Sequence, residues 1–181
     1  MKALISIDYT NDFVAEAGAL TAGIPAQAIH DRILELTKEF TERGDFVAYT
    51  IDRHEANDNY HPEMKQFPLH NVAGTWGHDL FGDLQAYYEQ TADLANVYWT
   101  DKRHYSAFAG TDLDIRLRER GITDLTLIGV DTDICVLHTA VDAYNLGYQI
   151  TVVSDAVASF NQAGHEWALN HFKTVLGATV I

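Results

Sequence analysis

The chain has 181 residues, with 26 acidic and 12 basic side chains and a formal net charge of −14 at pH 7. This length suits a single domain over residues 1–181, and the acidic balance argues against nucleic acid and anionic membranes as partners, because both need a basic face. Cys135 is the only cysteine, no apolar run is long enough to span a membrane, and an acid at Asp8 interrupts any signal-peptide core. We therefore expect a cytoplasmic protein.

Apolar runs and helical periodicity alternate along the chain. Runs rich in β-branched residues predict buried strands, and apolar residues spaced three or four apart predict helices. Pro25 and Gly44 are placed to begin and end one helix, and Thr111 with Asp114 forms a variant of the capping box at the start of another. We predict strands at residues 2–8, 46–52, 97–100, 125–130, 150–154 and 178–181, and helices at residues 26–43, 79–89, 111–120, 133–146 and 164–176.

Strands that alternate with helices indicate an α/β domain with a mostly parallel sheet. In such sheets, ligands bind beyond the carboxyl ends of the strands, where the strand order reverses. Polar residues follow several predicted strands, namely Asp8, Asp52, the pair Asp101–Lys102 and the turn with Cys135. We therefore expect them to share one rim of the sheet.

The first candidate site joins Asp8, Lys102 and Cys135. Cys135 lies in the first turn of the helix predicted after strand 125–130, where free N–H groups and the helix dipole favour a thiolate and can hold an oxyanion. A carboxylate can accept the proton of a thiol, and a nearby ammonium stabilises the charged pair. Each residue alone has an ordinary structural explanation, such as a buried core cysteine, but their shared rim favours nucleophilic catalysis.

The second candidate site is a metal centre. Asp52 and His54 are two residues apart at a strand end, so their side chains point to one side and can share an ion. His70, from the long polar segment 53–76, would be a third ligand, and Glu63 in that segment could bind directly or through water. Three protein ligands leave positions open for water and substrate, and this ligand set suits zinc, iron or manganese without selecting among them.

Three aromatic residues stand close to the rim segments in the sequence: Phe13, Phe67 and Tyr105. Aromatic side chains in such positions can hold a flat ring between them. Packing in the core explains them equally well, so both interpretations stay open.

Five short motifs follow one another along the chain. They are Ile-Asp8-Tyr-Thr-Asn-Asp12-Phe13, Asp52-x-His54, Phe67-Pro-x-His70, Lys102-Arg-x-Tyr-Ser-Ala-Phe and Gly129-Val-x-Thr-Asp-Ile-Cys135-Val. Together they resemble the isochorismatase-like cysteine hydrolases, from Lys2 to about Ala178. Within that family, the metal-ligand set is similar to that of the nicotinamidases of streptococci and related bacteria.

This resemblance implies a six-stranded parallel sheet with helices on both faces, and hydrolysis of nicotinamide to nicotinate and ammonia in NAD salvage. By position, it implies that Asp8 is the general base, Lys102 its partner and Cys135 the nucleophile. It also implies a cis peptide bond before Asp131, which turns the N–H groups of Asp131 and Cys135 into an oxyanion hole. The ligands that it implies for a divalent metal ion, zinc before iron or manganese, are Asp52, His54, Glu63 and His70.

One residue departs from the family pattern. Position 131 is apolar or small in that pattern, whereas here it is Asp131, and a charge beside an oxyanion hole disfavours thiolate and oxyanion unless it points away.

One alternative is a related enzyme that acts on another small amide or on a carbamoyl or ureido compound. From a different class, a non-catalytic metal- or ligand-binding module is the other alternative. A homo-oligomer is possible through an apolar helix face that the sequence does not locate.

Overall fold

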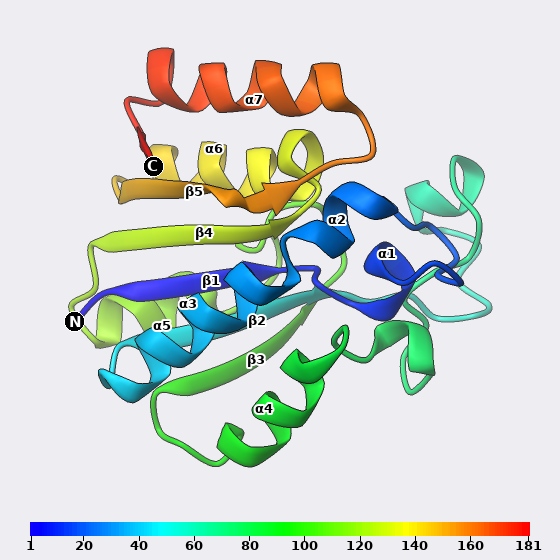
Figure 1. Cartoon of the computed structure of the whole chain (residues 1–181), viewed down its shortest axis with the longest axis horizontal. Helices are drawn as coiled ribbons and strands as arrows, with labels where there is room; N and C mark the ends of the chain where they lie inside the picture. Colours follow the sequence, from blue (N-terminus) through cyan, green and yellow to red (C-terminus); the bar gives the residue numbers. More distant parts are fainter.

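The computed structural model describes all of residues 1–181 and contains one six-stranded sheet in which every neighbouring pair of strands is parallel (Figure 1). The strands are β1 (Ala3–Ile7), β2 (Phe46–Asp52), β3 (Val97–Lys102), β4 (Asp124–Val130), β5 (Gln149–Ala158) and β6 (Thr179–Val180). Their order in the sheet is β3-β2-β1-β4-β5-β6, which reverses between β1 and β4. The predicted α/β fold with a parallel sheet is confirmed.

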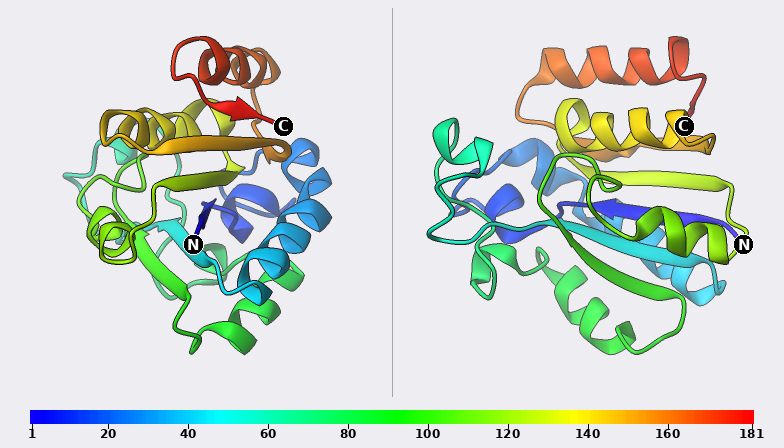
Figure 2. Two further views of the ribbon diagram at one scale, coloured as in Figure 1. Left: turned by 90° about the vertical axis from the view of Figure 1, so that its left-hand side faces the viewer. Right: turned by 180° about the vertical axis from the view of Figure 1, so that it is seen from behind.

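Helices cover both faces of the sheet (Figure 2). They are α1 (Asn11–Val14), α2 (Ile24–Ala28), α3 (His30–Glu42), α4 (Asp83–Thr91), α5 (Leu113–Glu119), α6 (Leu137–Asn145) and α7 (Gln162–Thr174). Alternate side chains of a strand face opposite sides, so Ile5 and Ile7 join the core under α5, α6 and α7, whereas Leu4 joins the core under α2, α3 and α4. None of the helices combines the length and hydropathy that a bilayer crossing needs.

The helix predicted at residues 26–43 is broken into α2 and α3 at Ile29. The Tyr9 hydroxyl donates a hydrogen bond of 2.6 Å to the Ala26 carbonyl oxygen. In a continuous helix that oxygen would accept from the N–H of His30. A tertiary contact from the end of β1 thus replaces one helical bond, which periodicity could not reveal.

The predicted capping box at Thr111 and Asp114 is also wrong. The helix begins at Leu113, and the Asp114 carboxylate accepts hydrogen bonds from the Tyr148 hydroxyl and the Arg118 guanidinium. These partners leave it turned away from the first N–H groups of the helix. Thr111 contributes through its hydroxyl oxygen, which accepts from the Leu113 N–H at 3.3 Å.

A close approach between β1 and β4 fixes the backbone just before the Cys135 turn. The register of β4 against β5 shifts between Leu127 and Gly129, and Gly129 has a φ of 118°. A Cβ atom at Gly129 would lie 2.0 Å from the Ile7 carbonyl oxygen. Glycine therefore allows β4 to pass beside the end of β1, where the strand order reverses.

We expect Gly129→Ala to lower the free energy of unfolding by more than ~3 kcal/mol, because strain at a positive φ adds to a clash with a main-chain oxygen. Gly121→Ala is the matched control, since Gly121 has a φ of 62° and open space around its missing Cβ, so its cost should be about 1 kcal/mol. Urea denaturation measures both variants. Equal losses would contradict the close-approach argument.

Candidate active site

Three strand ends deliver the predicted catalytic residues to one place. Asp8 follows β1, Lys102 is the last residue of β3, and Cys135 lies in a turn after β4. The Lys102 Nζ is 2.8 Å from Asp8 Oδ2, 3.7 Å from Cys135 Sγ and 3.8 Å from Asp52 Oδ1. All four residues are buried, so the structure brings the two predicted constellations together around one ammonium.

The electrostatics of this group keep the Cys135 thiol protonated at rest. Burial and the nearby Asp8 carboxylate raise the pKa of the thiol well above its usual value, and Lys102 opposes them only in part. Burial also raises the pKa of Asp8 to about 6, against the lowering effect of Lys102. The pKa of Lys102 is raised in spite of burial, chiefly by the Asp8 carboxylate.

The expectation that a helix start favours a resting thiolate is therefore wrong. Cys135 sits in a π-helical turn, η3 (Thr132–Val136), that precedes α6, and it packs within the apolar core. The N–H groups of Ile134 and Val136 both donate to the Asp131 carbonyl oxygen. Burial beside a carboxylate outweighs the effect of one short turn, so the thiol needs a base to remove its proton.

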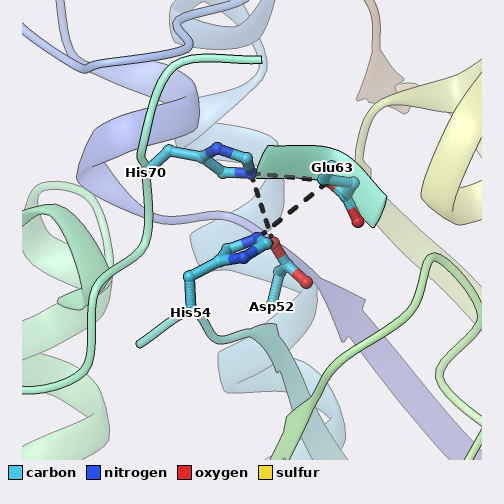
Figure 3. Close-up of side chains that lie close together, drawn as sticks. All are labelled: Asp52, His54, Glu63 and His70. Atoms are coloured by element: carbon cyan, nitrogen blue, oxygen red, sulfur yellow. Dashed lines mark hydrogen bonds and ion pairs between the residues drawn. The ribbon is translucent and has the colours of Figure 1, made fainter. Parts of the chain in front are cut away.

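The predicted metal ligands form a compact buried group (Figure 3). One ligand atom from each of Asp52, His54, Glu63 and His70 lies within 4.8 Å of all the others. The His70 Nε2 is 3.4 Å from Asp52 Oδ2 and 3.6 Å from Glu63 Oε2, and the His54 Nε2 is 2.8 Å from Asp52 Oδ2. Ligands about 2.1 Å from a tetrahedral ion are roughly 3.4 Å apart, so this group fits a divalent cation.

Two further observations support that fit. The His70 Nδ1 is 2.8 Å from the Pro68 carbonyl oxygen, which orients the ring and leaves Nε2 buried without a hydrogen-bond partner. Although burial lowers the pKa of His70, the carboxylates of Asp52 and Glu63 raise it to about 10. A raised imidazole pKa shows that the electrostatic potential at this site is negative. A divalent cation can neutralise that potential.

A cavity of about 270 Å³ connects the two groups. Its lining residues are Phe13, Leu20, Thr21, Asp52, Glu63, Phe67, Tyr105, Val130, Asp131, Ile134, Cys135 and Phe160. The three predicted aromatic residues therefore all lie on its wall, and their contact with a substrate ring stays a prediction. Leu20, Thr21 and Phe160 carried no signal in the sequence, because they reach the cavity from loops that lie outside every motif.

Asp12 has a supporting position that the sequence did not reveal. Its carboxylate accepts hydrogen bonds from the Asn71 N–H at 2.7 Å and the Ala19 N–H at 3.0 Å. It thereby fixes the loop next to His70. In the sequence, the only indication of this role was that Asp12 belongs to the first motif, directly before Phe13.

Asp101 does not join the site, contrary to expectation. Its carboxylate contacts Arg53, His78 and the indole N–H of Trp99. Neighbouring residues in a strand point to opposite faces, so Asp101 and Lys102 cannot both reach the cavity.

The oxyanion turn has the expected backbone, with a cis peptide bond between Val130 and Asp131. Asp131 lines the cavity and is 9% exposed. Burial and the Asp133 and Asp8 carboxylates raise its pKa to about 7.

Fold and site together define a doubly wound parallel α/β protein with a cysteine, a carboxylate and a metal-type ligand group at the carboxyl ends of its strands. The sequence matches the isochorismatase domain over residues 2–181, and the chain therefore belongs to the isochorismatase family.

Solved structures resemble this chain over its full length. A pyrazinamidase/nicotinamidase from Streptococcus mutans is 60% identical, with a TM-score of 0.98 and 100% of each chain covered. The nicotinamidase/pyrazinamidase PncA from Bacillus subtilis is 58% identical, with a TM-score of 0.98 and 99% of each chain covered. A pyrazinamidase of Pyrococcus horikoshii in complex with zinc is 29% identical, with a TM-score of 0.86, covering 99% of this chain and 98% of its own.

We expect His54→Ala to weaken binding of a divalent metal by more than ~100-fold. Loss of a residue that only orients a metal ligand already costs roughly 10–100-fold in metal affinity, and loss of the ligand itself should cost more. Elemental analysis after dialysis against trace metal measures the loss. His78→Ala is the matched control, since the His78 imidazole lies 3.4 Å from Asp101 and outside the ligand group. Unchanged metal content in His54→Ala would refute its assignment as a ligand.

We expect Lys102→Met to lower the free energy of unfolding by roughly 3–5 kcal/mol, because it leaves the buried Asp8 carboxylate without a cation. The double variant Asp8→Asn/Lys102→Met carries neither charge and should recover much of that loss. Urea denaturation of the single and double variants gives the coupling energy. Additive losses would show that the two charges do not depend on each other.

Proposed function

We propose that this protein hydrolyses nicotinamide to nicotinate and ammonia, with Cys135 as nucleophile. The observation that carries this proposal is the buried group of Asp8, Lys102 and Cys135, in which Cys135 lines a cavity that Asp52 and Glu63 of the metal-type group also line. The relatives named nicotinamidase that match the full chain support it. NAD salvage in the cytoplasm is the corresponding cellular role.

The chemistry begins with the thiol proton. Asp8 accepts that proton as Cys135 Sγ attacks the carboxamide carbon, and Lys102 stabilises the charges that form. In this proposal the N–H groups of Asp131 and Cys135 hold the oxyanion, and a donor of this kind typically contributes ~3 kcal/mol to transition-state stabilisation.

Collapse of that intermediate completes the first half of the reaction. The C–N bond breaks, and protonated Asp8 delivers its proton to the departing ammonia, leaving a thioester on Cys135. Water then attacks the thioester carbon as Asp8 takes its proton. The C–S bond breaks, the acid is released, and Asp8 returns the proton to the Cys135 sulfur.

Asp52, His54, Glu63 and His70 would hold a divalent cation, for which zinc is the first candidate because a relative is known in complex with it. Such an ion would supply Lewis-acid chemistry to the substrate. Phe13, Phe67 and Tyr105 would then hold the ring at its faces and edges. Phe13 also packs against the His70 ring, with centroids 5.3 Å apart.

Another small amide, or a carbamoyl or ureido compound, is the nearest alternative substrate. Such a compound would use the same thiol and base but would fill the cavity differently. A non-catalytic binding module explains the site less well, because binding alone has no need of a carboxylate beside a thiol. Self-association into a homo-oligomer stays a prediction.

We expect purified, metal-loaded protein to release ammonia from nicotinamide, and Cys135→Ala to lower kcat by at least ~10⁴-fold while it keeps its fold and metal. Coupled ammonia detection measures turnover, and a panel of small amides and ureido compounds tests the alternatives. Substantial turnover by Cys135→Ala would remove the cysteine from the mechanism. A folded, metal-loaded protein inactive on every compound would favour a binding role.

A further inference from the structure

Asp131 is a charged residue in the cavity for which the proposed mechanism uses only the backbone. Among the other polar residues on the wall, Asp52 and Glu63 belong to the ligand group and Cys135 is the nucleophile. The Thr21 hydroxyl oxygen accepts from the Gly23 N–H. The Asp131 carboxyl thus remains without a role.

The surroundings of Asp131 leave its carboxyl free to act on a ligand. The side chain is 9% exposed, and its Oδ1 is buried without a hydrogen-bond partner. No lysine or arginine pairs with it, in contrast to Asp8, which has Lys102 at 2.8 Å. The groups that shift its pKa are the Asp133 and Asp8 carboxylates and the opposing Phe160 N–H.

The reaction changes the charge of the group that is bound at Cys135, in the same cavity as Asp131. The acyl carbon bonds to Cys135 Sγ, four residues along the same short turn from Asp131. Before the reaction this carbon carries a neutral NH2 group, which can donate hydrogen bonds to a carboxylate. After hydrolysis this carbon belongs to an anionic carboxylate, which the carboxylates of Asp131 and Asp8 repel.

We propose that the Asp131 carboxylate distinguishes the neutral amide from the anionic acid product and so promotes release of that product. This inference rests on the proposed function, because it requires an amide substrate and an acid product. It assigns to Asp131 a specificity-determining role that its backbone N–H alone does not have. It also gives a use to an acidic residue beside an oxyanion hole.

The test compares binding of nicotinate and nicotinamide to metal-loaded Cys135→Ala, which cannot turn the amide over, by titration calorimetry at pH 8. Adding Asp131→Asn should tighten nicotinate binding by ~10-fold or more, the factor that corresponds to 1.4 kcal/mol, and change nicotinamide binding by less than ~3-fold. Asp131→Ser, which also lacks the charge, should give the same pattern. Metal content is measured for each variant.

Asp133→Asn is the matched control in the same turn. Its carboxylate accepts from the Ser159 hydroxyl at 2.6 Å and the Asn161 amide at 3.3 Å, and it does not line the cavity. It should therefore leave the nicotinate-to-nicotinamide affinity ratio close to that of the Cys135→Ala parent.

Two outcomes would overturn the inference and leave the proposed function standing. These are nicotinate affinity unchanged by both Asp131 variants, and an equal shift for the two ligands, in a protein whose wild type releases ammonia from nicotinamide. A wild type without that activity would instead overturn the proposed function, and this inference with it.

Discussion

The fully buried ammonium of Lys102 is the constraint on which the rest of the site depends. Moving a cation out of water is costly unless anions surround it closely, and here the Asp8 and Asp52 carboxylates lie within 3.8 Å, with the Cys135 sulfur at 3.7 Å as a further polar neighbour. Asp8 belongs to the nucleophile and Asp52 to the metal-type group, so one lysine joins both. A change of charge in either group therefore changes the electrostatic potential in the other, and the two groups act as one electrostatic unit.

The register of the parallel sheet puts these groups side by side. Asp52 and Lys102 are partners across β2 and β3, and parallel partners face the same side. Asp8 follows β1 between β2 and β4, and its Oδ1 accepts from the Asp52 N–H at 2.7 Å. Gly129 then lets β4 approach β1 closely, so that the next turn carries Cys135 to the same point. Residues at or just beyond the ends of four strands thus meet around the Lys102 ammonium, where the strand order reverses.

The sequence predicted what depends on burial and strand ends, and it could not predict what depends on contacts between distant segments. β2 has the predicted bounds because its apolar run is buried on both faces. The break between α2 and α3 at Ile29 comes from the hydrogen bond of Tyr9 to Ala26, which lies seventeen residues further along the chain. The raised pKa of the Cys135 thiol comes from its burial beside Asp8. Phe160 reaches the cavity wall from the end of β5, where periodicity carries no information.

The segment between β2 and β3 shows how polar contacts replace a core where a loop must carry ligands. His54, Glu63 and His70 are buried although no residue between 53 and 76 belongs to either apolar core. The loop is held instead by the Asn71 N–H on Asp12 and by the His61 ring at the Arg103 carbonyl oxygen. The carboxylates of Asp52 and Glu63 repel each other unless a proton or a cation lies between them. A divalent cation held by this group would therefore stabilise the loop, whose residues Glu63 and Phe67 form part of the cavity wall.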